Sequence, residues 1–279
     1  MNKSVVVIGG AGFLGKHVLT KLVGEGYSKV ICADVIDPNI KDVIFQKTDV
    51  LDPLSLSHIK YADFIINCTG QVTFPIEMCL RLNSQGLLNI INNVSGKNHM
   101  IQLSTVGVYG EVVVADETTS LNPQTPYSTA KAMAECLLTK ECKAPYTILR
   151  LSNLYGPGQP KGLMAYLKRS LNSDKKLEFN HSGEMVRSFL HVENCASTIS
   201  NLIKKLTTAT EVYNIAGEKT ISIPDLIKMI EKIKGVSYSI NWGDKPSWEN
   251  ISEIKTDKIK NLLSINQNYS LEEYIRSEF

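Results

Sequence analysis

Short apolar runs alternate along this chain with longer segments in which apolar residues recur at helical spacing. The run at residues 5–8 has four β-branched residues and ends at a glycine, which predicts a buried strand. Apolar residues between positions 14 and 23 then predict a helix that ends near Gly24 and Gly26. By the same criteria we expect further strands at 30–33, 63–68, 100–104 and 146–153, and further helices at 77–94 and 126–142.

This alternation of strands and helices with short connections is typical of a parallel sheet covered by helices on both faces. We therefore predict an α/β protein with a Rossmann-type doubly wound parallel sheet, whose ligands bind beyond the carboxyl ends of the strands. After Gly156 the pattern loosens; we expect strands again near 189–192 and 212–217, and a mostly helical chain from 221 onward. The predicted domains are an NAD-binding Rossmann domain (1–156 plus about 188–217) and a small C-terminal substrate-binding lobe (157–187 plus 218–279).

The composition narrows the class of protein. The 279 residues are 43% hydrophobic, enough for a substantial core, and the net charge of +2 without a basic stripe argues against a nucleic-acid partner. Six cysteines without C-x-x-C spacing predict a reducing compartment, no disulfide framework and no metal site. The chain enters its first strand directly and has no apolar segment of membrane-spanning length, so we expect a cytoplasmic protein without a membrane partner.

A glycine-rich turn lies between the first predicted strand and the first predicted helix. The segment VVVIGGAGFLG fits G-x-G-x-x-G from Gly10 and also a G-x-x-G-x-x-G spacing. Glycines there permit a tight turn and let backbone amides and the helix N-terminus approach a pyrophosphate. The alternative is a turn that only packs helix on strand. The residues that we expect to contact a dinucleotide here are Gly9, Gly12, Phe13, Leu14 and Gly15.

Two acidic positions add to the cofactor prediction. Asp34 ends the second predicted strand, where a carboxylate accepts hydrogen bonds from the adenosine ribose. Because a carboxylate repels a 2′-phosphate and the next residues, Val35 and Ile36, are not arginines, we expect NAD rather than NADP. Asp49 and Val50 follow a third strand and are in position to meet the adenine, although a simple turn aspartate is an equal alternative.

The stretch YSTAK places Tyr127 and Lys131 four residues apart, on one face of a predicted helix. A phenol beside an ammonium is either an acid/base pair or a surface coincidence. These five residues alone leave both readings open.

Six motifs taken in order carry a family resemblance: GGAGFLG, STVGVYG, PYSTAK, LRLSNLYGPG, RSFLHVENCA and YNIAG. The chain resembles the extended short-chain dehydrogenase/reductase family, and within it the NAD-dependent epimerase/dehydratase group that acts on nucleotide sugars. The match runs from Val5 to about Gly217. The resemblance implies an enzyme that uses NAD and a nucleotide-sugar substrate.

The resemblance also implies residue roles. Tyr127 matches the catalytic tyrosine and Lys131 the lysine, which also binds the nicotinamide ribose. A phenol has a pKa of about 10, and we expect the ammonium and the positive nicotinamide to lower it. Thr105 matches the hydroxyl that orients the reacting group, with Ser104 as the adjacent alternative.

Further positions match the family pattern less specifically. Cys68, Thr69 and Gly70 match a segment that passes along the cofactor, and Asn83 matches a residue that steadies the backbone of the site. Asn153 and Arg187 match contacts to the substrate's nucleotide or diphosphate, for which an arginine fork is suited. A surface salt bridge is the alternative for Arg187. His191 lies in an apolar strand, and we interpret it as a core histidine.

Departures from the pattern bear on the reaction. Members that remove water usually carry an acidic residue or an Asp-Glu pair just after the catalytic threonine, where this chain has Val106 and Gly107. We therefore favour a nucleotide-sugar 4-epimerase over a dehydratase or decarboxylase; the alternative is an NAD(P)H-dependent reductase of 4-keto sugars. A non-catalytic NAD-binding regulator is a third hypothesis. The usual second phosphate-binding arginine is not evident near the C-terminus.

The helices expected at 77–94 and 126–142 carry apolar residues on more than one side. The corresponding helices pair across a dimer in the family, so we expect a homodimer. The alternative is that both helices bury their extra faces within one subunit.

Overall fold

The computed structural model describes residues 3–71, 74–206, 209–264 and 268–279. Its centre is a seven-stranded sheet in the order β11-β7-β5-β4-β1-β2-β3, with every neighbouring pair parallel. The strands are β1 (Ser4–Ile8), β2 (Lys29–Asp34), β3 (Ile44–Lys47), β4 (Phe64–Asn67), β5 (His99–Thr105), β7 (Tyr146–Leu151) and β11 (Glu211–Ile215). The chain winds outward from β1 in both directions, which confirms the predicted Rossmann-type doubly wound fold. Within the described ranges, no helix is long and apolar enough to cross a bilayer.

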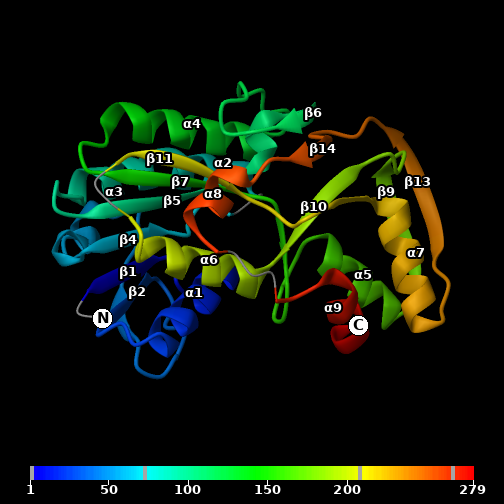
Figure 1. Cartoon of the computed structure of the whole chain (residues 1–279), viewed down its shortest axis with the longest axis horizontal. Helices are drawn as coiled ribbons and strands as arrows, with labels where there is room; N and C mark the ends of the chain where they lie inside the picture. Colours follow the sequence, from blue (N-terminus) through cyan, green and yellow to red (C-terminus); the bar gives the residue numbers. More distant parts are fainter. Residues whose placement is uncertain (1–2, 72–73, 207–208, 265–267) are drawn as a thin grey trace.

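Helices cover both faces of the sheet (Figure 1). The helices are α1 (Phe13–Gly24) and α6 (Val192–Ile203) on one face, and α2 (Ile76–Arg81), α3 (Leu87–Asn93) and α4 (Pro126–Glu141) on the other. Because strand side chains alternate, Val5 and Val7 pack toward α1 and α6, whereas Val6 and Ile8 pack toward α3 and α4. All four are essentially inaccessible to water. The apolar run read from the sequence is therefore a strand buried on both sides.

Two helical predictions determine where the candidate site residues lie. The segment predicted at 77–94 is one helical run in which α2 and α3 are joined by a π-helical turn, η3 (Leu82–Gly86). The helix predicted at 126–142 is α4. It starts at Pro126, and Thr125 caps it by accepting a hydrogen bond from the Ser128 amide at 3.2 Å. This start places Tyr127 in the first turn of α4.

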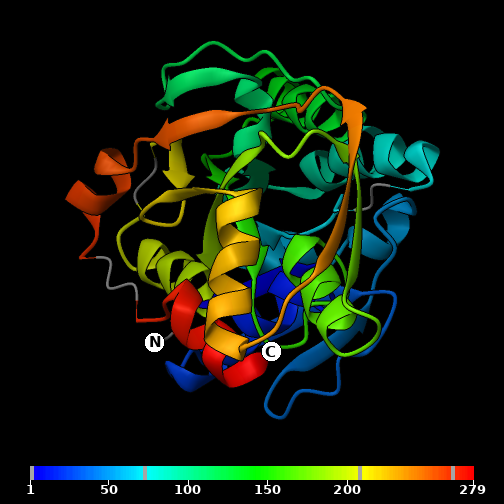
Figure 2. The ribbon, with the colours of Figure 1, turned by 90° about the vertical axis from the view of Figure 1, so that its right-hand side faces the viewer.

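The remaining elements form a separate layer beyond the carboxyl end of the sheet, on the right of Figure 1 and facing the viewer in Figure 2. Its strands are β8 (Asn153–Tyr155), β9 (Lys176–His181), β10 (Val186–His191), β12 (Thr220–Ser222) and β13 (Ser239–Lys245), and its helices are α5 (Leu163–Leu171), α7 (Ile223–Lys234) and α9 (Leu271–Glu278). They enclose an apolar cluster that includes Leu167, Ile227 and Tyr274. A core of its own supports the predicted substrate-binding lobe. The predicted boundaries leave β8 and most of β10 outside the lobe, and these boundaries stay a prediction.

The other short elements border the main sheet. They are η1 (Pro53–Leu56), η2 (Ile59–Tyr61), η4 (Val106–Tyr109), β6 (Val112–Ala115), β14 (Ile251–Ile254) and α8 (Asp257–Leu262). The expectation of a mostly helical tail is wrong in part, because β13 and β14 lie within it. Each pairs in parallel with a strand far away in the chain, β13 with β9 and β14 with β6. The expected strand at 189–192 also ends one residue early, since Val192 opens α6.

A buried ion pair connects α4 to the sheet. Arg150 on β7 donates from Nη2 to Glu135 Oε2 at 2.7 Å, and both side chains are at most 7% exposed. Arg150 Nη1 also donates to the Tyr109 hydroxyl at 2.9 Å. Ser104 donates to the same Glu135 carboxylate. Removal of one partner would leave a charge in the interior without compensation.

We predict that Glu135→Ala lowers the free energy of unfolding by about 3–5 kcal/mol, because Arg150 then stays buried without its carboxylate. Urea titration followed by circular dichroism measures the change. The matched control is Lys228→Ala, which breaks a pair whose lysine side chain is 74% exposed, with an expected loss below about 1 kcal/mol. Equal losses in the two variants would contradict the prediction.

Candidate active site

A cavity of about 440 Å³ opens at the carboxyl end of the sheet. Its wall combines the glycine turn after β1, the end of β5 with η4, the first turn of α4, the segment after β7, the loop 159–162, and residues of the lobe. This is the edge at which a doubly wound sheet binds its ligands. Among the described residues, no cluster of His, Cys, Asp and Glu could hold a metal ion.

The glycine turn fits a dinucleotide pyrophosphate. Gly9 has φ +75°, and a Cβ on Gly15 would lie 2.4 Å from the Gly9 carbonyl oxygen, so both positions require glycine. Helix α1 begins at Phe13, its N-cap Gly12 provides no side-chain cap, and its first turn holds no acidic residue. Gly9, Gly12, Phe13, Leu14 and Gly15 all line the cavity. An uncapped helix N-terminus with close backbone approach suits a phosphate group.

Asp34 lies beside this turn at the end of β2. One carboxylate oxygen accepts a hydrogen bond from the Ala11 amide at 2.9 Å, and the other accepts from the Ile36 amide at 3.2 Å. The side chain is half-buried, and its neighbours Val35 and Ile36 are exposed apolar residues. Asp34 therefore stabilises the glycine turn and keeps lone pairs for a ribose hydroxyl, which fits NAD.

Asp49 and Val50 have local structural roles. The Asp49 carboxylate accepts a hydrogen bond from the Leu51 amide at 2.9 Å, which is the turn role that we considered as the alternative. Val50 is buried, and its carbonyl oxygen accepts from Asn89 Nδ2 at 2.9 Å. Both follow β3, as expected, and a contact with adenine stays a prediction.

The segment after β4 forms a wall of the cavity and is held from behind by Asn83. Cys68 lines the cavity, and Thr69 donates to Asn67 Oδ1 from both its amide and its hydroxyl. Asn83 is 2% exposed and donates from Nδ2 to the Gly70 carbonyl at 3.1 Å. Gly70 has φ +77°, and a Cβ there would lie 2.5 Å from Asn83 Oδ1. The geometry is that of a residue that steadies the site's backbone.

Lys131 is fully buried, so the reading of a solvated surface lysine is wrong. Its Nζ donates to the Thr69 carbonyl at 3.1 Å and to the Leu103 carbonyl at 3.2 Å. The ammonium thus joins α4 to the segments at the ends of β4 and β5. Burial lowers the pKa of Lys131 from 10.5 to about 8.

Tyr127 lines the cavity one helical turn before Lys131, and its hydroxyl donates to Gln71 Oε1. We expected a lowered pKa for this phenol, but its removal from water raises the pKa above the ordinary value of 10.0. Groups of the protein alone therefore favour the neutral phenol. Any lowering has to come from a ligand.

The end of β5 distinguishes Thr105 from Ser104. Thr105 lines the cavity, and its Oγ1 accepts a hydrogen bond from the Gly107 amide at 3.1 Å. Ser104 also lines the cavity, but it is buried and its hydroxyl donates to Glu135. Because a hydroxyl that accepts from an amide still has its own proton to donate, Thr105 is the better candidate to contact a substrate.

Asn153 and Arg187 lie on neighbouring strands of the lobe and both line the cavity. Asn153 Nδ2 donates to the Ser188 carbonyl at 3.3 Å. Arg187 donates to three backbone carbonyls, those of Val186 and Glu249 from Nη1 and that of Trp248 from Nη2. In the described part of the chain these hydrogen bonds replace the surface salt bridge that we considered as the alternative. Burial lowers the pKa of Arg187 without removing its charge.

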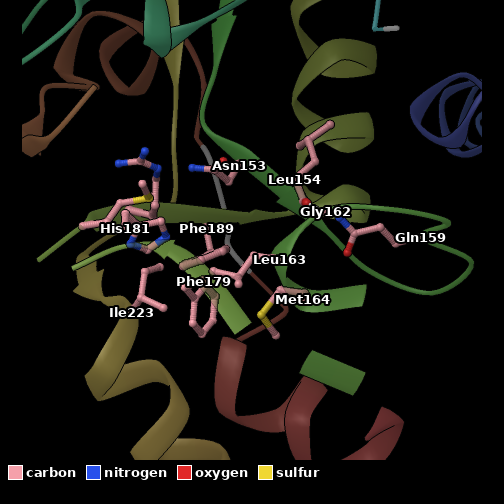
Figure 3. A pocket seen from close by; sticks show the side chains of 12 residues that line it. Asn153, Leu154, Gln159, Gly162, Leu163, Met164, Phe179, His181, Phe189 and Ile223 are labelled. Carbon is pink, nitrogen blue, oxygen red and sulfur yellow. Dashed lines mark hydrogen bonds between the residues drawn. The ribbon is translucent and has the colours of Figure 1, made fainter. Parts of the chain in front are cut away.

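A second cavity of about 260 Å³ adjoins the first, and Asn153 and Arg187 line both. Figure 3 shows its other walls, which are mostly apolar or aromatic. They include Phe179, His181 and Phe189 from β9 and β10, together with Ile223 at the start of α7. A flat apolar group joined to an anion would fit this pair of cavities.

His191 is the core residue that we predicted. It is 3% exposed and stacks on Tyr269 with ring centroids 4.4 Å apart. Its Nδ1 accepts from the Glu193 amide at 3.2 Å and so caps α6. Burial lowers its pKa to about 4, which keeps the ring neutral.

The cavity residues that the sequence analysis missed include Gln71, Lys161 and Glu249. Gln71 accepts from Tyr127, and Lys161 Nζ donates to the Gln71 carbonyl at 3.1 Å. Gln71 directly follows the predicted cofactor segment, so its position in the sequence could have identified it as a site residue. Glu249 comes from a loop between β13 and β14, and no motif marks it.

The lowered pKa of Lys131 predicts a pH dependence of stability in the protein without added NAD. Below pH about 8 the lysine is charged in the folded and unfolded states, and its burial costs about 3 kcal/mol. Between pH about 8 and 10.5 the folded state releases the proton first, so the stability of the wild type should rise relative to Lys131→Met. Urea titrations of both proteins from pH 7 to 10.5 measure the difference, and a constant difference would refute the assignment.

Known proteins resemble this chain in sequence and in overall fold. The sequence model described as NAD dependent epimerase/dehydratase family matches residues 5–216. dTDP-D-glucose 4,6-dehydratase of Mus musculus is 26% identical over 93% of this chain and 83% of its own length. The structure of UDP-glucose 4-epimerase from Thermotoga maritima with UDP-glucose superposes with a TM-score of 0.85 at 25% identity, over 99% of this chain and 96% of that one.

The fold is equally close to a second epimerase. UDP-glucuronic acid 4-epimerase from Bacillus cereus, in complex with UDP-glucuronic acid and NAD, superposes with a TM-score of 0.87 at 24% identity, over 99% of this chain and 97% of that one. The predicted resemblance is confirmed by a family match that covers most of the chain. The chain belongs to the NAD dependent epimerase/dehydratase family, whose members are NAD-dependent enzymes that modify nucleotide sugars.

Proposed function

We propose that the protein is a nucleotide-sugar 4-epimerase that acts by reversible hydride transfer at a sugar carbon. The observation that carries the proposal is the convergence of Thr105, Tyr127 and the glycine turn on one cavity, with Lys131 directly behind its wall. The same arrangement supports NAD as the cofactor, bound by the glycine turn and Asp34. The catalytic roles below rest on this convergence.

When bound, NAD⁺ supplies the hydride acceptor and donor and adds a positive charge beside the phenol. Tyr127 then acts as the base that takes the proton of the sugar hydroxyl and later returns it. Thr105 donates a hydrogen bond to the same sugar oxygen and orients it. Lys131 contributes a second positive charge, and its hydrogen bonds fix the helix that carries Tyr127. Because burial raises the pKa of Tyr127, its deprotonation depends on the cofactor being present.

The two adjoining cavities support a nucleotide diphosphate as the handle of the substrate. A guanidinium has five N–H donors, and the described contacts of Arg187 use three of them. The others are available for diphosphate oxygens, as is the side chain of Asn153. The neighbouring apolar cavity with Phe179 and Phe189 suits a planar base.

The dehydratase reaction is disfavoured, although a dehydratase is among the relatives. Elimination of water needs a proton donor for the leaving hydroxyl and a base for the neighbouring carbon. Val106 and Gly107 provide neither, and Glu249 is the one acidic residue in the described cavity wall. A 4-keto sugar that forms in the cavity is therefore expected to be reduced again rather than dehydrated.

On the helices that are expected to pair across a dimer, Leu80 of α2 is an exposed apolar side chain, 42% accessible. Dimer formation and a cytoplasmic location stay predictions of the sequence.

The proposal is tested by releasing the cofactor from purified protein with denaturant and by assaying epimerisation without added NAD. We expect about one NAD⁺ per chain and interconversion of UDP-glucose and UDP-galactose, or of the corresponding dTDP or GDP pair. A site that retains no NAD⁺ but consumes NADH with a 4-keto nucleotide sugar would identify the reductase instead. If the protein is inactive with all of these substrates, the hypothesis that remains is a non-catalytic NAD-binding regulator.

Tyr127→Phe should lower kcat by at least about 10²–10³-fold, because the variant lacks the proton acceptor. Retained NAD⁺ should be unchanged, since the ring still fills its place in the wall. Tyr61→Phe serves as the control, because Tyr61 is 75% exposed and lies outside the cavity. Turnover near the wild-type rate in Tyr127→Phe would refute the mechanism.

A further inference from the structure

Glu249 is an acidic residue in the loop between β13 and β14, and it lines the cavity. The Glu249 amide donates to Gln124 Oε1 at 2.7 Å, its carbonyl accepts from Arg187 at 3.1 Å, and its Oε1 accepts from the Thr125 hydroxyl at 2.7 Å. Its backbone has φ +58°, in the left-handed region that residues other than glycine rarely adopt. Three hydrogen bonds thus hold an unfavourable conformation, which is typical of a functional position.

The carboxylate of Glu249 occupies space beside Gly107 in which a side chain would otherwise lie. A Cβ on Gly107 would be 2.8 Å from Glu249 Oε2. Within the described part of the chain, no protein group donates a hydrogen bond to Oε2, and Glu249 is the only acidic residue in the cavity wall. A single carboxylate from a remote loop therefore lies beside positions 106 and 107, which carry no acid of their own.

The position of Glu249 relates it to the sugar. Its carbonyl contacts Arg187, the candidate for the diphosphate, and its carboxylate adjoins η4, which directly follows Thr105. Arg187, Tyr127 and Glu249 line the same cavity, so a sugar between a diphosphate at Arg187 and a reacting carbon at Tyr127 shares that cavity with the carboxylate. Oε2 can accept a hydrogen bond from a sugar hydroxyl, and it repels a sugar carboxylate.

We propose that Glu249 determines substrate specificity by admitting nucleotide sugars with an uncharged sugar and excluding nucleotide uronic acids. The inference rests on the proposed function, because it assumes that a nucleotide sugar occupies the cavity. Lys161, a cation of the same wall, is the feature that would favour the opposite preference.

The test is calorimetric titration of the NAD⁺-loaded protein with UDP-glucose, UDP-glucuronic acid and UDP. In the wild type we expect UDP-glucose to bind at least about tenfold more tightly than UDP-glucuronic acid. The variant Glu249→Gln keeps a hydrogen-bond acceptor for Thr125 but loses the charge. In this variant UDP-glucuronic acid should bind more tightly, so the ratio of the Kd of UDP-glucuronic acid to the Kd of UDP-glucose should fall by about tenfold. Glu253→Gln on β14 removes an exposed carboxylate from the same segment and should leave the ratio unchanged.

A second variant tests the placement and does not alter Glu249 itself. Gly107→Ala puts a methyl group against Oε2, so the carboxylate has to move and the same ratio should fall. An unchanged ratio in both variants, or a wild type that binds the uronic acid as tightly as UDP-glucose, would overturn the inference and leave the epimerase proposal standing. Failure of all three ligands to bind, with no epimerase turnover, would overturn the proposed function and this inference with it.

Discussion

The site depends on one buried ammonium. Lys131 has no exposure to water, and its hydrogen bonds go to carbonyls at the ends of two adjacent strands. A buried charge is costly unless hydrogen bonds compensate it, so α4 cannot shift along the sheet without losing that compensation. The position of α4 fixes Tyr127, and the bond to Thr69 fixes the backbone that leads to Gly70. Lys131 therefore fixes the positions of both Tyr127 and the segment after β4 that forms a wall of the cavity.

The parts of the structure that could be predicted from the sequence are those whose physical cause is local. The glycine turn needs only a strand, three small residues and a helix in succession, and all of these are contiguous. Tyr127 and Lys131 share a helix face because they are one turn apart. The run at β1 is apolar on both faces because helices cover both faces of the sheet, and that pattern is visible without the fold.

Other features depend on contacts between distant segments. The strands β13 and β14 are half polar and each needs a partner from an earlier part of the chain, so their sequences do not distinguish them from loops or helices. Glu249 enters the cavity only because that pairing places its loop above α4. The protein groups alone raise the pKa of Tyr127, whereas we expected the ammonium and the nicotinamide to lower it. Neighbouring charges can be guessed from spacing, but burial is known only from the fold.

The hydrogen bonds that hold Arg187 have a consequence for the folding of the chain during its synthesis. Two of the three carbonyls that hold its guanidinium belong to Trp248 and Glu249, and β6 obtains its partner strand from residues that follow them. The strands and helices of the main sheet are all synthesised by about residue 215. Ile259 and Leu263, however, belong to the same buried core as α1 and α6, so the core behind the dinucleotide pocket is complete only when nearly the whole chain has been synthesised. The hydrogen bonds that hold Arg187 form at the same late stage, because they need the carbonyls of residues 248 and 249.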